Sequence, residues 1–396
     1  MEQKKKFLKG ALIGALAMFI IGIVIGGFAV GFLLYGASDG PVGPDTTRKI
    51  AEIRRYIDKC YLYKDEVDEE QLQEQIIKGY VDGLEDPYTV YYNEKETREL
   101  FESTTGEFGG IGVVIKKDTD TGLLIFVDVY EDSPGEKAGF RYGDLVYKVN
   151  GEDVTNMDMD TIVSKIRGEV GTNIEITVLR GVDRKEYTGT ATRALIENDT
   201  VYSEMKEGQL GYIEITGFED VTYKQFKEAL DTLTAGQMKG LVVDLRNNPG
   251  GNLTTVCEIM DLLLPEGTIV SVKDRDGKGQ KYLSDGEKKL EVPLVVLINQ
   301  YSASASEIFA GAIQDYGIGK LVGMTTYGKG VVQNVYRLSD GTAFKVTSSE
   351  YFTPNGRNIH GIGIKPDVEI EYVYDEANPD ADNQLDKALE TLKNGM

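Results

Sequence analysis

Residues 293–308 read PLVVLINQYSASASEI, and this stretch decides the fold of the chain. Its apolar run, 294–298, has the length of a fully buried strand, and the small polar residues after it open a helical segment from Ser304. A strand, a turn and a helix in this order are typical of an α/β core, and here the turn presents serines at its bend. The pattern alone does not choose among Ser302, Ser304 and Ser306.

A lysine flanked by glycines follows the serine turn. Lys329 stands between Gly328 and Gly330, and its other neighbours are aromatic and apolar, so we expect its ammonium group to lose contact with water. Desolvation lowers the pKa of a lysine, and a neutral lysine can accept the proton of a serine hydroxyl. Together with the serine turn, this predicts a pair of nucleophile and base, for which we take Ser304 and Lys329 as the candidates.

Each of these residues also has a simpler interpretation. Ser304 and Glu307 fit a capping box, in which the serine oxygen accepts a backbone N–H and takes no part in chemistry. Lys329 fits a solvated loop residue. Residues 323–329 fit the spacing of a phosphate-binding loop, but Gly330 stands where such a loop needs Ser or Thr, and a strand follows instead of a helix. We therefore discard the phosphate-binding interpretation.

The chain has one histidine and two cysteines among its 396 residues, which limits its chemistry. These residues do not supply a conventional zinc site without carboxylates, and we expect neither a metal nor another cofactor. A Ser-His-Asp triad would have to use His360, which lies in a turn-like stretch, so lysine is the better partner for the serine. Cys60 and Cys257 fall in helical stretches, and we interpret them as small buried residues rather than as a disulfide framework.

The formal net charge of −22 argues against nucleic acid as a partner, because a phosphate backbone requires a basic surface. The charge is distributed unevenly, since residues 1–9 contain four lysines and one glutamate. We expect the acidic remainder to be soluble and to be repelled by anionic lipid.

An uncharged run follows the basic residues. Residues 10–38 contain no charged side chain, which exceeds the ~20 apolar residues that a membrane-spanning helix needs. We expect a transmembrane anchor at residues 10–37, with residues 1–9 in the cytoplasm and the bulk of the chain outside the cytoplasmic membrane. A cleaved signal peptide is the alternative, although its apolar core is typically ~7–15 residues. Residues 38–45 have the composition of a linker.

Residues 46–105 have apolar positions at helical spacing, first from Ile50 to Cys60 and then from Leu72 to Leu84. Two amphipathic helices cannot bury their apolar faces alone, so this region must pack on another domain or another subunit. We expect a helical N-terminal region. Homodimerisation through it is a hypothesis, and docking onto the same chain is the alternative.

From residue 106 the sequence changes to short strands, glycine turns and one helical stretch. Residues 106–182 resemble a PDZ domain. The motifs that carry the resemblance are GGIG at 109–112, SP at 133–134, AG at 138–139, GD at 143–144, VNG at 149–151 and IRG at 166–168.

The PDZ resemblance implies a site for the C-terminal tails of proteins. Successive glycines leave backbone N–H groups free to bind a terminal carboxylate, and the following strand edge adds the tail as one more strand. A tight turn without a ligand is the alternative. Arg167 is suited to attract the carboxylate, with a surface arginine as its alternative. The residues expected to bind the peptide are Gly109, Gly110, Ile111, Gly112 and Val113.

A second strand-turn-helix unit precedes the serine stretch. Residues 240–246, GLVVDLR, read as a buried strand, and residues 247–251, NNPGG, as a turn before the helical stretch 252–264. A turn at the start of a helix exposes backbone N–H groups beside the positive end of the helix dipole, which suits an oxyanion. Strands that alternate with helices indicate an α/β core over residues 183–372, followed by a linker and helix at 373–396.

Several long motifs stand in register behind the PDZ-like block: DLRNNPGG at 244–251, NQYSASASEI at 299–308, YGKG at 327–330 with Gln333, TPNGR at 353–357 and GIKPDV at 363–368. These motifs make residues 46–372 similar to the C-terminal processing peptidases, which are tail-specific serine proteases of family S41. Met324 and Tyr327 stand where the family often has charged or Phe residues, which would alter packing near Lys329 without removing it.

The family resemblance implies roles for individual residues. Ser304 becomes the nucleophile, Lys329 the general base, and Gln333 the residue that orients the lysine. The oxyanion hole of the family maps onto the backbone N–H groups of Gly250 and Ala305. Asp315, in the stretch QDY at 314–316, matches an acidic position of some members of the family, where a structural role is the alternative.

The resemblance also implies a fold and a function. The expected fold is α/β, a crotonase/ClpP-like core of ββα units with an inserted PDZ domain, a helical N-terminal region and one N-terminal transmembrane helix. The expected function is that of a membrane-anchored, extracytoplasmic serine endopeptidase that binds protein C-terminal tails and cleaves peptide bonds through an acyl-enzyme. A catalytically silent PDZ scaffold is the alternative. Acyl-CoA chemistry shares the fold, but the sequence marks no nucleotide pocket.

Overall fold

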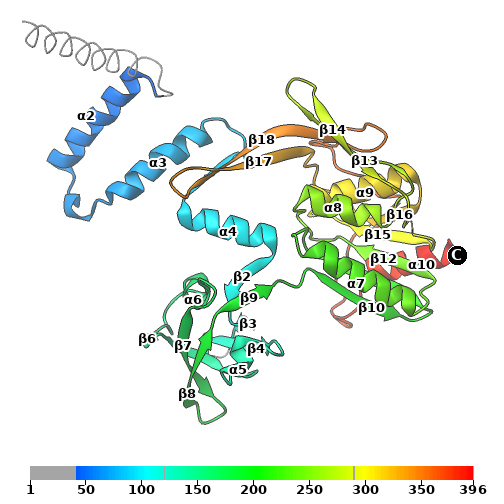
Figure 1. Cartoon of the computed structure of the whole chain (residues 1–396), viewed down its shortest axis with the longest axis horizontal. Coiled ribbons are helices and arrows are strands. Elements are labelled where there is room, and N and C mark those ends of the chain that lie inside the picture. Colours follow the sequence, from blue (N-terminus) through cyan, green and yellow to red (C-terminus); the bar gives the residue numbers. More distant parts are fainter. Residues whose placement is uncertain (1–41, 120, 289, 396) are drawn as a thin grey trace, which may run out of the picture. The chain divides into compact units, whose positions relative to one another are not determined.

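The computed structural model describes residues 42–119, 121–288 and 290–395 (Figure 1). The expected basic segment, residues 1–9, and the expected membrane anchor, residues 10–37, lie outside the described residues. In the described part of the chain, no helix is both long enough and apolar enough to cross a membrane.

The chain divides into two compact units, and the first, residues 1–76, is helical where it is described. Helix α2 (Pro44–Cys60) is followed by a short 3₁₀ helix, η1 (Lys64–Glu66), and by the start of helix α3 (Glu69–Asp82). Helix α2 begins with a proline, whose missing N–H costs nothing at this position, and it buries none of its residues. Our expectation that Cys60 is buried is therefore wrong, because this cysteine is exposed at the end of α2.

The second unit, residues 77–396, contains the end of α3, strand β1 (Val90–Tyr92) and helix α4 (Glu94–Thr105). Strand β1 pairs antiparallel with β18 (Ala343–Phe352), so a segment from the N-terminal region joins a sheet formed by residues far along the chain.

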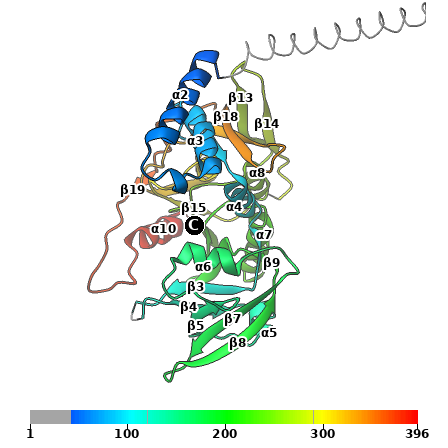
Figure 2. The ribbon, with the colours of Figure 1, turned by 90° about the vertical axis from the view of Figure 1, so that its left-hand side faces the viewer.

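An antiparallel sheet forms a small domain in this unit (Figure 2). Helices α5 (Pro134–Lys137) and α6 (Met159–Ile166) accompany it, and its core includes Phe126 and Ile174. Strand β8 pairs with β7 along its whole length, so the sheet extends beyond residue 182, where the sequence analysis ends this block. The strands run in the order β3 (Val113–Lys117), β4 (Leu124–Val129), β5 (Leu145–Val149), β7 (Asn173–Arg180) and β8 (Lys185–Thr192), with β6 (Glu152–Asp153) paired to β5.

The larger core is built on a mostly parallel sheet, with only β10 antiparallel to its neighbour. Two short strands, β2 (Glu107–Gly110) and β9 (Ala194–Glu197), pair with each other where the chain enters and leaves the small domain. The strands of the core sheet run in the order β10 (Val201–Lys206), β11 (Leu210–Ile215), β12 (Gly240–Asp244), β15 (Leu294–Ile298), β16 (Gly319–Gly323) and β19 (Val368–Glu369).

Alternating residues of the central strands face two different layers of helices. Val243 and Val296 belong to a core shared with α7 (Thr222–Ala235), α8 (Leu253–Asp261) and α9 (Ala305–Tyr316). On the opposite face, Val242, Val295 and Leu297 pack with Ala388 and Leu392 of α10 (Asn383–Asn394). A strand buried on both faces has to be apolar throughout, which explains the continuous run 294–298.

A second antiparallel sheet lies in the same unit. Its strands are β13 (Gly267–Asp274), β14 (Gly279–Ser284), β17 (Val331–Arg337) and β18, with β1 paired to β18. The expected α/β class is confirmed, and β17 begins two residues after Lys329.

Candidate active site

The backbone of Ser304 is strained. It lies between β15 and α9 with φ +55° and ψ −112°, whereas a residue that caps a helix normally has an extended backbone. Such a conformation costs a residue with a side chain about 1–3 kcal/mol and persists where the surrounding structure imposes it, often at functional sites.

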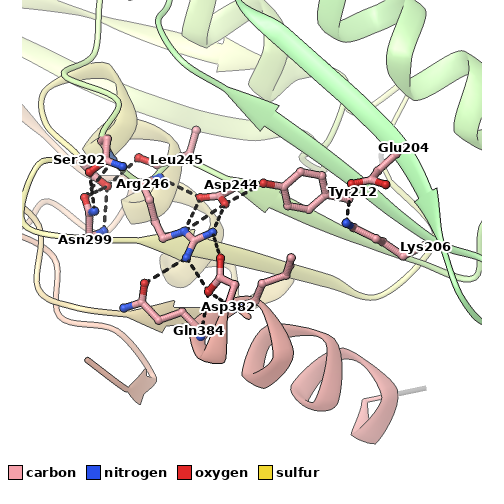
Figure 3. Close-up of polar contacts among 12 residues, drawn as sticks. Glu204, Lys206, Tyr212, Asp244, Leu245, Arg246, Asn299, Ser302, Asp382 and Gln384 are labelled. Atoms are coloured by element: carbon pink, nitrogen blue, oxygen red, sulfur yellow. Dashed lines mark hydrogen bonds and ion pairs between the residues drawn. The ribbon is translucent and has the colours of Figure 1, made fainter. Parts of the chain in front are cut away.

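The hydroxyl groups of the other two serines of the turn donate hydrogen bonds to backbone carbonyls. The buried Ser302 hydroxyl donates to the carbonyl of Leu245 at 2.7 Å, a contact visible in Figure 3. The buried Ser306 hydroxyl donates to the carbonyl of Asn248 at 2.9 Å. Both serines therefore bind the turn that follows β12, and the half-buried Ser304 is the serine left for chemistry.

A buried carboxylate joins the serine turn to the lysine loop. Oε2 of Glu307 accepts the amide of Ser304 at 2.9 Å and the amide of Lys329 at 2.8 Å. Oε1 accepts the amide of Gly328 at 2.7 Å and the hydroxyl of Thr326 at 2.6 Å. One arm of the predicted capping box is thus present, but the same carboxylate also fixes the neighbouring loop. The capping-box spacing does not indicate this second role.

Tyr351 contacts the same two segments from β18. Its hydroxyl donates to the carbonyl of Ser304 at 3.1 Å, and its amide donates to the carbonyl of Gly330 at 3.0 Å. Burial raises the pKa of Tyr351 well above its usual value, so the hydroxyl keeps its proton and remains a donor. No sequence signal singles out this tyrosine.

The amine of Lys329 is largely removed from water. Its Nζ lies 4.8 Å from the centre of the Tyr88 ring. Burial lowers the pKa of Lys329, and Lys345 acts in the same direction, whereas Glu307 and Asp86 oppose the shift. This is the direction that a general base needs.

Two expected side-chain contacts are not among the hydrogen bonds of the described residues. None joins the hydroxyl of Ser304 to the amine of Lys329, and Gln333 donates to the hydroxyl of Thr347 at 3.3 Å instead of binding the lysine. His360, the alternative base, is exposed, and its Nδ1 accepts the amide of Gly330. The structure links serine and lysine through their backbones.

The two expected oxyanion donors differ in whether their backbone amides already have an acceptor. A Cβ built on Gly250 would come within 2.9 Å of both the Ala305 nitrogen and the Ser304 Cβ, so Gly250 lies against the serine. Its amide, however, donates to Oδ1 of the buried Asn248 at 2.8 Å. Ala305 is the first residue of α9, and within the described residues the structure gives its amide no acceptor. In this structure the side chain of Asn248 therefore satisfies the amide of Gly250.

The C-terminal helix supports the turn that contains Asn248. The Arg246 guanidinium lies between Asp244, at 2.6 Å, and Asp382, at 2.7 Å, and also donates to Gln384 (Figure 3). Asp382 also caps the start of α10. Arg246 thus fixes α10 to the end of β12, just before the turn that supports the candidate site.

Asp315 lies in a separate structural contact. Its buried carboxylate pairs with Arg357 at 2.5 Å and accepts the amide of Asn355 at 2.8 Å. It therefore connects the end of α9 to the turn after β18, in keeping with the structural alternative.

The expected peptide-binding loop divides into two parts. Gly109 and Gly110 belong to β2 and pair with β9. Ile111 is buried in the small domain, and neither it nor Gly112 has an acceptor for its backbone N–H among the described residues. Val113 starts β3, an edge strand of the domain.

Arg167 of the small domain is engaged with α4 and β2. Its guanidinium stacks 4.0 Å from the centre of the Phe108 ring and lies 3.7 Å from the Glu102 carboxylate. In this structure Arg167 therefore binds other residues of the same chain.

Three family models match successive parts of the chain. Residues 37–97 match the activating protease CtpB N-terminal domain, residues 125–180 the PDZ domain and residues 209–370 peptidase family S41. The chain thus has the domains of a PDZ-containing serine peptidase.

Individual relatives agree with these matches. The carboxy-terminal processing protease CtpA of Bacillus subtilis is 34% identical over 340 residues, 85% of this chain and 72% of that protein. The CtpB protease of the same organism is 36% identical over 313 residues, 78% of this chain and 65% of that protein. The chain belongs to the carboxy-terminal processing proteases of peptidase family S41. A solved putative S41 protease from Bacteroides fragilis, 17% identical with a TM-score of 0.51, has the same fold over 86% of this chain and 97% of that one.

Proposed function

We propose that the chain is an endopeptidase in which Ser304 is the nucleophile and Lys329 the general base. The observation that carries this proposal is the shared oxygen of Glu307, which accepts both backbone amides, at 2.9 and 2.8 Å. The two residues are therefore held close together by their backbones. The desolvated amine and the strained serine support the same assignment.

In the proposed reaction, Oγ of Ser304 attacks the scissile carbonyl carbon while Nζ of Lys329 accepts the hydroxyl proton. The tetrahedral intermediate collapses when the lysine returns that proton to the leaving amine, which leaves an ester on the serine. Water, deprotonated by the same lysine, then attacks the ester, and the lysine returns the proton to Oγ of Ser304 as the acyl group leaves as a carboxylic acid. Gln333 would have to leave Thr347 in order to orient the lysine. Catalytic contacts are often long in unliganded enzymes, so the serine and lysine side chains have to approach when substrate binds.

The amide of Ala305 is the oxyanion donor that is ready in this structure, since it is the first amide of α9. Gly250 becomes the second donor only if its amide leaves Asn248. Each such donor is worth about 3–4 kcal/mol of transition-state stabilisation.

The small domain is proposed to bind the C-terminal tails of protein substrates. The N–H groups of Ile111 and Gly112 bind the terminal carboxylate, and the tail pairs with the exposed edge of β3, whose first residue is Val113. Arg167 would have to exchange Glu102 for the substrate carboxylate to take part.

Residues 10–37 are proposed to anchor the protein in the cytoplasmic membrane, with the protease outside it; their uncharged composition supports this. A homodimer through the N-terminal helices is also proposed. Its support is the exposure of apolar side chains such as Ile53 and Tyr56 on α2.

The proposal is tested by degradation of a reporter protein with varied C-terminal tails. We expect tail-dependent cleavage by the parent chain and none by Ser304→Ala, and a fluorophosphonate probe should label the parent at Ser304. A protein that binds the tails but neither cleaves them nor reacts with the probe would be the silent scaffold.

A further inference from the structure

A turn of the N-terminal region reaches the catalytic lysine. Residues 86–89 lead into β1, which pairs with β18. The turn places the ring of Tyr88 4.8 Å from Nζ of Lys329. The match to the peptidase family begins only at residue 209, so this contact comes from outside the peptidase core.

Hydrogen bonds anchor the turn to the strands around the lysine. The Thr89 hydroxyl donates to Asp86 at 2.6 Å and accepts the amide of Thr347 at 3.0 Å. The Thr347 hydroxyl in turn accepts the side-chain amide of Gln333 at 3.3 Å. A continuous chain of hydrogen bonds thus joins the turn to Gln333, and it fixes where the adjacent Tyr88 lies.

We propose that Tyr88 is a positioning residue of the reaction, whose ring covers the amine of Lys329 and excludes water from it. The inference rests on the proposed role of Lys329 as the base. The N-terminal region then completes the active site, because without β1 and its turn this side of the amine would face solvent.

The ring has two opposing effects on the lysine. Its face attracts the ammonium form through a cation–π interaction. Exclusion of water favours the neutral form, and because burial has the largest effect on the pKa of Lys329, we expect it to outweigh the attraction. Removal of the ring should therefore raise the pKa of Lys329.

Several other groups around the amine also affect the pKa of Lys329. Burial has the largest effect on the pKa of Lys329 and lowers it; Lys345 acts in the same direction. Glu307 and Asp86 act in the opposite direction, and neither outweighs burial. The titratable groups that face this region are Asp86 and Tyr88 of the turn, Glu307 of α9, Tyr327 of the lysine loop, Lys345 of β18 and His360 after β18.

The test compares Tyr88→Ala with Tyr88→Phe in the full chain carrying Ser304→Ala, which cannot turn over substrate. Acetic anhydride labels Lys329 at a series of pH values, and mass spectrometry of the peptide that contains Lys329 gives the midpoint of its deprotonation. We expect the midpoint to rise by about one pH unit in Tyr88→Ala, a tenfold change in the neutral fraction, and to stay unchanged in Tyr88→Phe. Equal midpoints in all three proteins would overturn the inference.

The same two substitutions in the chain with Ser304 intact separate this inference from the proposed function. The rising limb of kcat/KM against pH should move upward in Tyr88→Ala and not in Tyr88→Phe, with both variants folded by thermal melting. A shifted labelling midpoint in a protein without peptidase activity would support the contact and refute the base. Lost activity with an unshifted midpoint would reduce Tyr88 to a structural residue and overturn the inference.

Discussion

The hydroxyl of Tyr351 donates to the backbone carbonyl of Ser304 at 3.1 Å. That carbonyl already accepts the amides of Glu307 and Ile308 as the first bonds of the helix, so it does not need a third donor. The carbonyl of Ser304 and the amide of Ala305 belong to one planar peptide group. Tyr351 therefore helps to fix the direction of the proposed oxyanion donor.

Replacement of this tyrosine should affect catalysis more than stability. In Tyr351→Phe we expect the free energy of unfolding to fall by about 0.5–1.5 kcal/mol, the net worth of one hydrogen bond. We expect kcat to fall about tenfold with KM unchanged, because the donor acts on the transition state. Urea unfolding and steady-state kinetics on a tailed reporter measure the two effects, and an unchanged kcat would refute the positioning role.

The strain at Ser304 predicts a gain of stability on loss of the side chain. Glycine tolerates φ +55° without the cost that serine bears, so Ser304→Gly should be inactive yet more stable than Ser304→Ala by up to about 1 kcal/mol. Ser306→Ala should instead lose about 0.5–1.5 kcal/mol, the net worth of one hydrogen bond, because the carbonyl of Asn248 still accepts the amide of Ala303. Equal melting temperatures for the glycine and alanine variants at 304 would show that the backbone is not strained there.

The lowered pKa of Lys329 predicts how the stability and the activity of the protein change with pH. The folded protein binds fewer protons at this site than the unfolded chain between the lowered pKa and 10.5, so stability rises with pH across that window. Lys329→Met lacks this penalty and should be the more stable protein at neutral pH, with the difference closing as the pH rises. The activity of the parent should increase with pH over the same range. Chemical unfolding at several pH values checks the first statement and pH-rate profiles the second.

Some of these features could be predicted from residues that are neighbours in the sequence, and others could not. The strand at 294–298 and the serine turn were predictable because apolar runs and helix starts are encoded by neighbouring residues. The contacts of Tyr351 and Tyr88 with the site were not, since they depend on the pairing of β18 with strands distant in sequence. The amide of Gly250 depends on the side-chain conformation of Asn248, which no spacing rule specifies.

The link between α10 and the core predicts a remote effect on activity. Arg246 is mostly buried between Asp244 and Asp382, and loss of one partner leaves its charge less well compensated. Asp382→Asn should lower the free energy of unfolding by about 1–3 kcal/mol and reduce kcat through the turn at Asn248. Lys393→Gln, on the exposed end of the same helix, serves as the control. Unchanged kcat in folded Asp382→Asn would mean that α10 stabilises the core without supporting the site.

The substitution Glu307→Gln separates the hydrogen bonds of this side chain from the effect of its negative charge. In Glu307→Gln the side-chain nitrogen must face two donors, and each buried amide left without an acceptor costs about 1–3 kcal/mol. The negative charge of Glu307 raises the pKa of Lys329, so its loss should lower that pKa further. We therefore expect a lower maximal kcat together with a rising limb displaced to lower pH, the opposite direction from Tyr88→Ala. Glu258→Gln, on the exposed side of α8, should change neither quantity; a limb that moves upward in Glu307→Gln would contradict this account of the lysine.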